Sequence, residues 1–582
     1  MSRSRNLFLS LVVGCLVATS VVGQVTLSGN ISDGSGGPLL SGVVYHATGD
    51  LTVPTGSTLT IQAGAIIKFT FDKQMTVNGQ LVAQGTMAAP IVLTSIEDDT
   101  AGGDTNGNGP SVGVPDSWRS LRFNATATGT VSYLQLRFAG RLGLGGIGVN
   151  GSTVAFNDCT VSDCSAAGLT LNNTATASTF TSCQFTNNNR AVEGVRLENV
   201  PNFTSNTASG NTVNDCLSVS SGTIASGTTT ITTSNMISNV ILCPTNITVA
   251  AGSTLAIDQG CIIKMAFDRQ VTVNGTLNCS GSSASPVIFT SLVDDAHGGD
   301  SNNDGTNTAP GPDSWRTIAF NNGSGPSQLA FTEIWYGGRL ANAGFEVQDA
   351  SVDMDHCAAR FCNAAGLDLN NQTGTVTVTN CDFSDNDRAV VGVPLAALPG
   401  FVNNTASNNA AHDTIEISSA SLSSGATAIA AVNMLSNVVI CPSINVAAGA
   451  TLSLGQGCIL KMNFDRQVTV SGVLTCSGTP GAPVVFTSLE DDSAGGDTNH
   501  DGTATLPAPD HWRGVILQSG SASSTLVDTH VRYAGRLQLP SIRVADDVTL
   551  RSCTVLSCNS DGIQLTGSAR PIIEDCLVDS CG

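Results

Sequence analysis

The stretch from residue 247 to residue 291 reads ITVAAGSTLAIDQGCIIKMAFDRQVTVNGTLNCSGSSASPVIFTS. Short apolar runs alternate in it with turn residues, at 247–249, 255–257, 262–265, 271–273, 277–279 and 287–290. Every third run returns after a similar step, since 271 − 247 = 24, 277 − 255 = 22 and 287 − 262 = 25. Three short strands in roughly 24 residues predict a parallel β-solenoid, because such a coil cannot bury its interior face alone and has to stack on the next one.

The same block occurs two more times, at residues 51–95 and 444–488. Each copy leads into an acidic loop and then into a Cys-rich segment, and equivalent loop residues are 196 or 197 positions apart (300 − 104 and 497 − 300). We therefore divide the chain into three homologous β-helix units, at residues 24–235, 236–432 and 433–582. The third unit is expected to be incomplete, because the sequence stops in mid-pattern without a visible C-terminal cap over the open core.

Composition agrees with short strands and limits the partners. The 582 residues include 62 Gly, and only 12% are charged, which is typical of tight turns and small strands. The net charge of −21 argues against a nucleic-acid partner, which needs a basic surface. An acidic surface suits divalent cations and solubility.

Residues 1–23 have the pattern of a secretory signal peptide: Arg3 and Arg5 precede an apolar run, and small residues precede a cleavage site at Gln24. A lipoprotein cleavage box at residues 12–15 is the less favoured alternative, because the apolar run continues past Cys15. No later run approaches the ~20 apolar residues of a membrane-spanning helix. We therefore expect a protein that is secreted or displayed at the cell surface.

Cysteines recur at the coil spacing. The pairs are Cys159 and Cys183, Cys357 and Cys381, Cys553 and Cys576, and Cys558 and Cys581. Their separations match one coil, since 183 − 159 = 24, 381 − 357 = 24, 576 − 553 = 23 and 581 − 558 = 23. Residues one coil apart lie within the roughly 4.4–6.8 Å between Cα atoms that a disulfide requires. Disulfides and a ladder of reduced, buried thiols both fit this spacing.

The strand blocks, followed by the text EDD, GGDTNGNG and DSWRSLRF at residues 97–123, resemble the right-handed parallel β-helix repeat proteins that bacteria secrete. These belong to the pectin-lyase-like superfamily. The resemblance covers nearly the whole mature chain and implies an all-β, right-handed parallel β-helix, with about eight coils in each unit. It implies little about activity, because that superfamily includes polysaccharide lyases, glycoside hydrolases, adhesins and plain stalks.

The acidic loops contain D-x-N-x-[ND]-G, followed by D-x-W-R. Oxygen side chains on alternate residues with a turning Gly in sixth place are typical of Ca²⁺ sites. The twelfth residue is Pro115, Gly311 or Ala508 where an EF-hand has Glu, and no flanking helices are indicated. We therefore predict a calcium loop inserted in the β-helix and closed by the later Asp. The alternative is an Asx-rich turn without metal.

The predicted Ca²⁺ ligands are the carboxylates and amides of these loops. Copy one should bind most weakly, since Asn108 replaces an Asp. The candidates are Asp98, Asp99, Asp104, Asn106, Asn108 and Asp116 in copy one; Asp294, Asp295, Asp300, Asn302, Asp304 and Asp313 in copy two; and Asp491, Asp492, Asp497, Asn499, Asp501 and Asp510 in copy three.

Other repeated residues allow a functional and a structural interpretation. The Trp of each D-x-W-R could form a sugar-stacking platform, or could anchor the loop with the next Arg paired to an acid; we favour the anchor, because an apolar strand follows. Three other repeated positions hold residue types that a Ca²⁺-dependent lyase uses. They are the lysines of the IIKF, IIKM and ILKM runs, the Asp four residues later and the Arg of each GRL. Because an active site is usually built once, we favour charges that line one face of the rod.

These patterns favour a secreted or cell-surface β-helix protein with a structural or adhesive role, stiffened by Ca²⁺. A cell-surface or extracellular polysaccharide is the expected partner, held by weak equivalent sites on a rigid spacer. No residues are assigned to catalysis. The competing interpretation is a polysaccharide-degrading enzyme, either a Ca²⁺-dependent lyase or a glycoside hydrolase.

Overall fold

The three-strand coil predicted from residues 247–291 is confirmed. The computed structural model describes residues 25–172, 177–370, 372 and 374–582. One coil consists of β23 (Ile247–Val249), β24 (Thr254–Asp258) and β25 (Ile262–Met265), and the next of β26 (Val271–Val273), β27 (Thr276–Ser280) and β28 (Val287–Ser291). These strands pair in parallel at Ile247–Val271, Leu255–Leu277 and Ile262–Ile288, so partners are one coil apart on each of the three faces.

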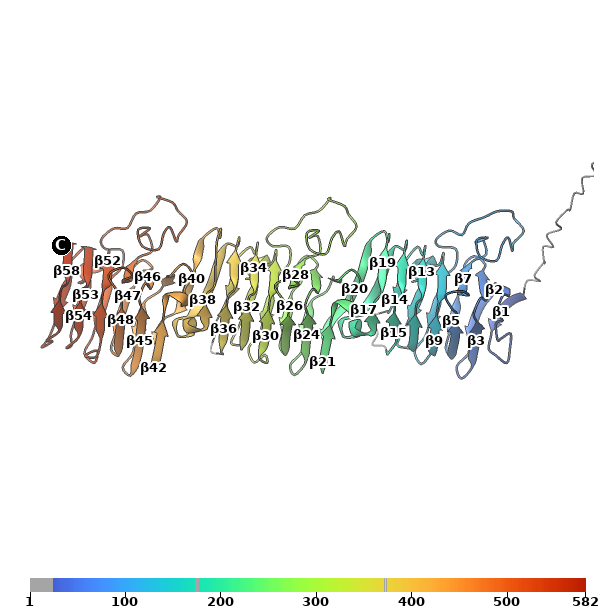
Figure 1. Cartoon of the computed structure of the whole chain (residues 1–582), viewed down its shortest axis with the longest axis horizontal. Helices are drawn as coiled ribbons and strands as arrows, with labels where there is room; N and C mark the ends of the chain where they lie inside the picture. Colours follow the sequence, from blue (N-terminus) through green and yellow to red (C-terminus); the bar gives the residue numbers. More distant parts are fainter. Residues whose placement is uncertain (1–24, 173–176, 371, 373) are drawn as a thin grey trace, which may run out of the picture.

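Stacking of such coils continues through all three units, so the chain forms one straight rod from β1 (Val25–Asn30) to β58 (Leu577–Cys581) (Figure 1). Two faces merge into a 33-stranded sheet, because long strands bend round the edge between them; in the third unit one of these faces is instead a separate six-stranded sheet, from β41 (Ser421–Leu422) to β56 (Ile563–Leu565). For example, β2 (Val44–Val53) pairs first with β4 (Ile66–Phe69) and then with β5 (Met75–Val77). Almost every backbone partner of a coil therefore lies in the coils before and after it.

Each repeat spans seven coil steps and not the eight that were expected. On one face, β27 leads through β30 (Ser327–Ala330), β33 (Val352–Asp355), β36 (Val376–Thr379), β39 (Phe401–Val402), β42 (Gly425–Ile429) and β45 (Ala450–Gly455) to β48 (Val473–Ser477). Thr276 in β27 and Val473 in β48 are equivalent residues. The acidic loop takes its residues outside the coils, which accounts for the missing step.

The core is a continuous apolar column. A single cluster of buried residues extends from Leu27 to Cys558. In the first unit the rings of Phe123, Phe156, Phe180 and Phe203 follow one another with centroids 5.6, 5.3 and 4.7 Å apart. Burying such a side chain contributes about 1.5–3 kcal/mol, and the ladder repeats that gain from coil to coil.

Buried asparagines form a second ladder, which satisfies the backbone of the turns. Asn188 accepts a hydrogen bond from the Cys164 N–H (3.1 Å) and donates one to the Val161 carbonyl (3.0 Å). Its own N–H donates to Asn211 Oδ1 in the next coil (2.8 Å). Asn386 and Asn409 repeat this arrangement in the second unit.

The third face is interrupted at two places, which we call joints. Joint 1 (residues 205–227) lies between β18 (Phe203–Thr204) and β21 (Thr228–Ile231), and joint 2 (residues 403–424) lies between β39 and β42. This face therefore consists of three sheets, with six, seven and six strands. Helix η3 (Thr233–Asn235) packs beside joint 1, where Asn235 donates across the break to the Phe203 carbonyl at 2.8 Å.

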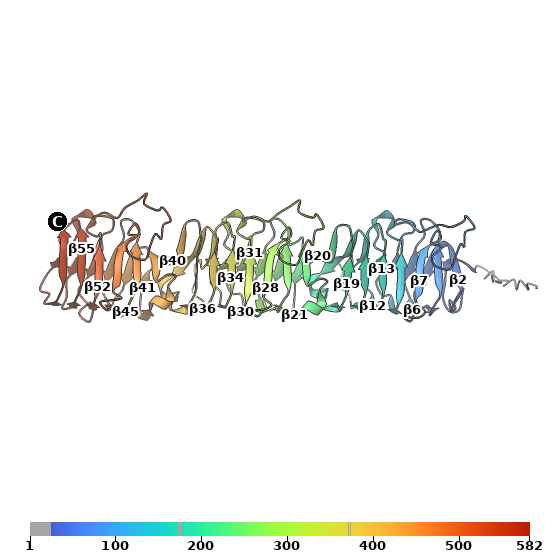
Figure 2. The same ribbon diagram turned by 45° about the horizontal axis from the view of Figure 1, so that its top comes forward.

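Three long loops project from one edge of the rod (Figures 1 and 2). Loop 1 (residues 96–120) connects β7 (Ile91–Ser95) to β8 (Leu121–Phe123). Loop 2 (292–317) connects β28 to β29 (Ile318–Phe320), and loop 3 (489–513) connects β49 (Val484–Ser488) to β50 (Gly514–Leu517). Because each repeat takes a whole number of coils, all three loops leave the rod in the same direction.

The predicted signal peptide at residues 1–23 lies outside the described residues. Among the residues that are described, none belongs to a helix long and apolar enough to span a bilayer.

Candidate metal centres in the three loops

The first Asp of each D-D pair holds the base of its loop from inside the rod. Asp98, Asp294 and Asp491 are buried. Each Oδ2 accepts a hydrogen bond from a strand threonine, at 2.6, 2.5 and 2.6 Å. Each Oδ1 accepts one from the N–H two residues later, at 3.2, 3.0 and 3.1 Å. These three ligand candidates therefore stabilise turns, and none joins the carboxylate clusters described below.

A buried lysine supports each loop from beneath. Lys68, Lys264 and Lys461 are fully buried, and their Nζ atoms donate to loop carbonyls of Gly103, Gly299 and Gly496 at 2.6, 2.7 and 2.7 Å. Burial lowers the pKa of each ammonium group, and the loop carboxylates around it oppose that shift. We interpreted these lysines as charges that line one face of the rod; they lie instead beneath the loops, which fold over them.

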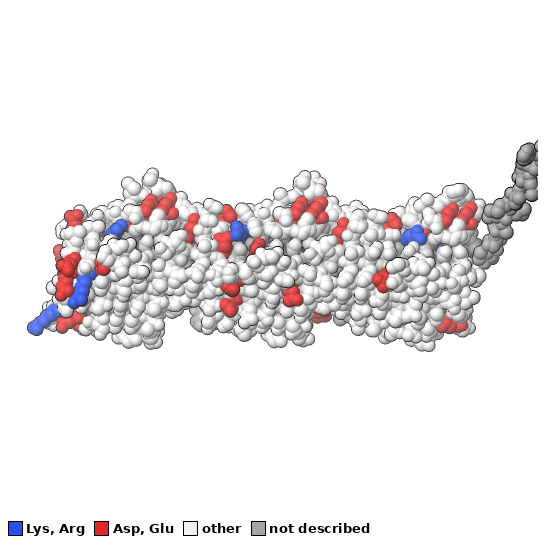
Figure 3. All heavy atoms as spheres, in the orientation of Figure 1, with Lys and Arg blue, Asp and Glu red and all other residues white. Residues whose placement is uncertain are grey.

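In loops 2 and 3 the remaining acids converge. Oxygens of Asp295, Asp300 and Asp304 lie within 4.8 Å of one another, and Asp492, Asp497 and Asp501 repeat this group. Figure 3 shows acidic patches on the projecting loops along the same edge. Burial, and then the neighbouring carboxylate of Asp300 or Asp497, raises the pKa of Asp295 and of Asp492. Such crowded carboxylates repel one another unless a proton or a cation lies between them.

Several oxygens of these two clusters are buried and accept no hydrogen bond from any described residue. They are Oδ1 of Asp295, Asn302 and Asp304 in loop 2 and Oδ1 of Asp492, Asn499 and Asp501 in loop 3. The hydroxyls of Ser301 and Thr498, beside them in sequence, are buried and equally without a partner. Because leaving a buried polar atom unpaired costs about 1–3 kcal/mol, the arrangement fits a bound cation with oxygen ligands.

Loop 1 contains the same motif but satisfies it internally. Asn106 and Asn108 both donate their side-chain amides to Glu97 Oε2, at 3.0 and 2.8 Å. The two oxygens of Asp104 accept hydrogen bonds from Gly107 and Gly109, and Asp99 Oδ2 accepts one from Ser111. Within the described part of loop 1, only Asp99 Oδ1 is a buried ligand oxygen without a partner.

The later Asp of each loop does not join the cluster. Asp116, Asp313 and Asp510 lie where the loop returns to the rod, and their carboxylates pair with Arg141, Arg339 and Arg536 at 3.1, 3.2 and 3.8 Å. All three have positive φ, of 72°, 85° and 86°. Each of these Asp residues therefore closes its loop by an ion pair with an arginine of the next coil.

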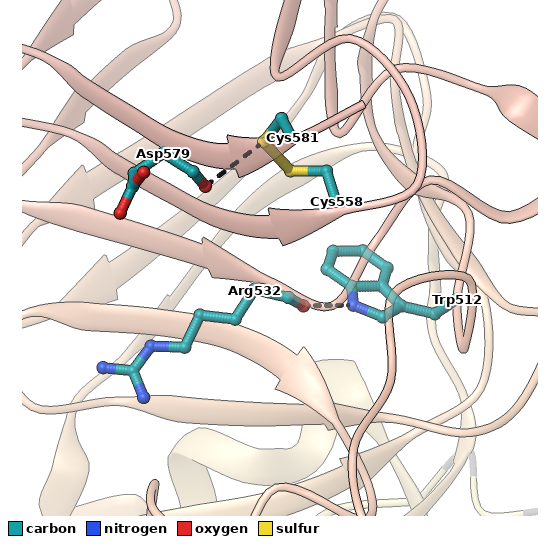
Figure 4. The surroundings of a disulfide bond; sticks show 5 residues. All are labelled: Trp512, Arg532, Cys558, Asp579 and Cys581. Atoms are coloured by element: carbon teal, nitrogen blue, oxygen red, sulfur yellow. Dashed lines mark hydrogen bonds between the residues drawn. A yellow bond between two sulfur atoms is a disulfide. The ribbon is translucent and has the colours of Figure 1, made fainter.

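The repeated tryptophans are loop anchors. Trp118, Trp315 and Trp512 are fully buried, and each indole N–H donates to a strand carbonyl at 2.8 Å. Figure 4 shows this bond from Trp512 to the Arg532 carbonyl. Trp118 also stacks on Phe69 with the ring centroids 4.3 Å apart. A sugar cannot reach rings in this position, so the stacking platform is excluded for these three residues.

The arginine after each tryptophan is paired to an acid, as the anchor interpretation required. Arg119 binds both oxygens of Asp72, at 2.8 and 2.9 Å, and Arg141 Nε binds the same carboxylate at 3.0 Å. The hydrogen bond from Arg119, aided by Arg141, lowers the pKa of Asp72 to about 2. Asp268 and Asp465 stand in equivalent pairs of arginines. The residue types that suggested a lyase are therefore engaged in three identical structural networks.

Most coil-spaced cysteines form the buried thiol ladder. Cys159, Cys183, Cys357 and Cys381 are buried and reduced, and burial raises the pKa of the Cys164 and Cys362 thiols to about 12. The described residues contain one disulfide, between Cys558 and Cys581 (Figure 4). Both interpretations of the spacing therefore occur in the same chain.

Comparison with known families adds a match at the N-terminal end of the rod. Residues 31–108 match the model of the pectate-lyase-like β-helix domain. In fold, the chain is similar to the pectin-lyase-like right-handed β-helix proteins. The match covers the first coils of the β-helix and extends into loop 1, and the same coils continue to β58. The curated proteins and the solved structures that were compared with the chain gave no match.

Two contributors to the loops of this β-helix protein were missed from the sequence. The lysine was considered only as a surface or catalytic charge, although its position within an apolar run in all three copies indicates burial. Glu97 was not considered as a partner for the loop amides. The equivalent residues are Val293 in loop 2 and Glu490 in loop 3. The sequence shows this difference between the copies, but only the folded loop shows which amides Glu97 contacts.

Proposed function

We propose that this protein is a secreted or cell-surface structural rod with an adhesive role, and that its second and third loops hold Ca²⁺. The observation that carries the proposal is the set of unpartnered, buried oxygens in loops 2 and 3. A cation there would neutralise three crowded carboxylates and give the amide oxygens of Asn302 and Asn499 a partner. Calcium suits this set better than a smaller ion, because it accepts six to eight oxygen ligands in flexible geometry.

Calcium binding is tested on the full mature chain by titration calorimetry after chelator treatment, with metal content measured in parallel. We expect two sites per chain with similar affinity and a third that is weaker or undetectable. Calcium at 100 times its Kd should then stabilise the fold by about 2.7 kcal/mol per site, seen as a higher Tm than in chelator. A chain that takes up no calcium and melts identically in both solutions would refute the metal proposal.

The adhesive part rests on shape and surface. Three outcrops face one way on a rigid spacer, and the flank visible in Figure 3 carries few charges. Such a sparsely charged flank suits an uncharged, hydroxyl-rich polymer, and a long polysaccharide could contact several units of one rod at once. With Trp118 and its equivalents buried, contact would be through polar side chains. We expect weak binding to extracellular polysaccharide that falls stepwise when one unit after another is removed.

An assay for unsaturated products from polyuronates, with and without chelator, separates this role from that of an enzyme. A structural rod releases none. A chelator-sensitive signal that disappears when Asp72 alone is changed, and survives the same change at Asp268 and Asp465, would overturn the structural assignment.

A further inference from the structure

Loops 2 and 3 reach back along the rod and touch the unit that precedes their own. At the tip of loop 2, the Asn303 side-chain amide donates to the carbonyl of Asn211. At the tip of loop 3, His500 Nε2 lies 3.4 Å from Asp413 Oδ2. Asn303 and His500 occupy the same position in the two loops, between two residues of the oxygen cluster.

Both contacts are made at the joints. Asn211 lies within joint 1, in the turn between β19 (Thr207–Ser209) and β20 (Asn214–Ile224), and Asp413 lies within joint 2, in β40 (His412–Ser419). Each joint runs through the coil in which pairing on the third face is interrupted. The two receiving turns are built alike: the Asn211 N–H donates to Asp215 Oδ1 at 3.0 Å, and the Asn409 N–H donates to Asp413 Oδ1 at 2.9 Å. Asn211 and Asn409 are also the last members of their asparagine ladders. Loops 2 and 3 therefore each contact the turn in which the asparagine ladder of the preceding unit ends.

The backbone conformation at this position supports a contact role for the side chains of Asn303 and His500. The position has a left-handed backbone in all three loops, with φ of 70° at Gly107, 50° at Asn303 and 50° at His500. Glycine adopts this conformation most readily, and loop 1 has it. Loops 2 and 3 instead have a residue that is less favourable there but that bonds to the preceding unit.

Burial follows the same division. The motif residues Asp104, Asn106 and Asn108 of loop 1 are exposed, whereas Asn302 and Asp304 in loop 2, like their equivalents in loop 3, are half-buried. The loops that touch a preceding unit are thus the loops whose oxygen clusters are partly shielded from water, although Asp300 within the loop 2 cluster is exposed.

We propose that loops 2 and 3 are clamps that lock each joint and that a cation in the loop tightens the clamp. The second half rests on the proposed calcium sites; the first half does not. A bound ion fixes the residues on either side of Asn303 and His500, so it holds those side chains on the joints. Calcium would in this way make the two joints behave as continuous β-helix.

Hydrogen exchange read by mass spectrometry tests this on the full chain, in calcium and in chelator. The segments to follow are residues 205–227 and 403–424. In the unchanged protein we expect calcium to slow exchange at both joints by about tenfold or more, relative to chelator. Asn303→Gly should abolish the slowing at joint 1 only, and His500→Gly at joint 2 only. Glycine suits the backbone at this position, so the loop itself should keep its shape and its calcium, which calorimetry verifies.

Gly107→Asn is the matched control, because it places the same side chain in loop 1, where a Cβ has open space within 4 Å. It should leave exchange at both joints unchanged. In chelator, Asn303→Gly should still speed exchange at joint 1, because that bond needs no ion. Variants that bind calcium normally and exchange like the unchanged chain at both joints overturn the clamp. An unchanged chain that binds no calcium overturns the metal sites and leaves the clamp to be judged in chelator.

Discussion

Neighbouring residues in this rod can have different roles, depending on what surrounds each side chain. Asp98 and Asp99 are adjacent in the turn after β7, yet Asp98 is buried beneath the turn and accepts a hydrogen bond from Thr94, whereas Asp99 faces the loop and accepts one from Ser111. Asp72 lies between two arginines at the surface and Trp118 lies in the core, and both fix the loop to the rod. These two residues allow direct tests of the anchor.

Lowering the pH should break the ion pairs of Asp72, which form the surface part of the loop anchor. The pKa of Asp72 is lowered from 3.8 to about 2, so its pairing with Arg119 and Arg141 contributes fully above about pH 4 and is lost as the pH falls through about 2. Asp72→Asn should therefore lower the Tm at neutral pH, and its Tm curve should meet that of the unchanged protein near pH 2. Two curves that stay a constant distance apart from pH 7 to pH 2 would contradict this assignment.

Trp118, the buried part of the anchor, should contribute more to stability than Asp72 does. Trp118→Ala removes a fully buried ring and should cost about 3–5 kcal/mol in urea unfolding of the first unit. Trp335→Ala provides the control, since that half-buried ring lies outside the core cluster and should cost less. Equal losses from the two variants would mean that Trp118 is not a core anchor.

At the scale of elements, the asparagine ladder and the loops show how stacked coils satisfy polar groups. Buried turns expose N–H and carbonyl groups that the strand ladders do not reach, and an Asn in the adjacent coil supplies both a donor and an acceptor. The loops do the reverse in units 2 and 3, where six buried carboxylate and amide oxygens receive no hydrogen bond from the described residues. A ladder rung and a loop can each be tested by a single substitution.

Asn188→Ala should destabilise the first unit by about 1–3 kcal/mol for each buried group left unpaired, here the Cys164 N–H and the Val161 carbonyl. The measurement is urea unfolding followed by circular dichroism. Gln184→Ala, on the exposed side of the same coil, should change stability by less than about 0.5 kcal/mol. A loss at residue 184 as large as that at residue 188 would reject the ladder as a source of stability.

Exchanging one ligand between loops should exchange their affinities. Asp304→Asn makes loop 2 resemble loop 1 and should weaken its calcium binding about tenfold, or ~1.4 kcal/mol, because a ligand charge is lost. Asn108→Asp should strengthen loop 1, since the new carboxylate is repelled by Glu97 and turns to the ion. Calorimetry on both variants measures the affinity of each loop for calcium. An unchanged number of tight sites in both variants would refute the assignment of ligands.

The sequence predicted elements far better than partners. The return of every third apolar run placed β23 to β28 in register, because the strand period and the coil period both appear in the chain itself. The roles of the candidate ligands were less predictable. Asp294 and Asp295 are chemically identical in a sequence, and only the fold decides which is buried. The pairing of Asp313 with Arg339 depends on where a long loop rejoins the rod, and no periodicity describes that point.

At the scale of the whole molecule, the single core column makes the rod rigid enough to fix distances between loops. Seven coil steps separate loop 2 from loop 3, and stacked strands are ~4.8 Å apart, so the two clusters should lie about 34 Å from each other. The apolar core runs through both joints, which leaves little room for bending at any one coil.

This spacing can be measured with Gd³⁺ in the two proposed calcium sites, by double electron–electron resonance. We expect one narrow distance near ~34 Å. Asp304→Asn, which weakens the loop 2 site, should remove most of that signal. A broad distribution, or a distance much shorter than this, would show that the units fold back on one another.

The whole-number count of coils in each repeat also governs how such a protein can change in length over evolution. Duplicating one complete repeat adds seven coils and returns the next outcrop to the same edge, so a longer descendant keeps all its outcrops in line without any further substitution. An insertion that adds part of a coil would instead turn everything beyond it towards another side of the triangle. Duplication of entire repeats is therefore the route to length that preserves the alignment.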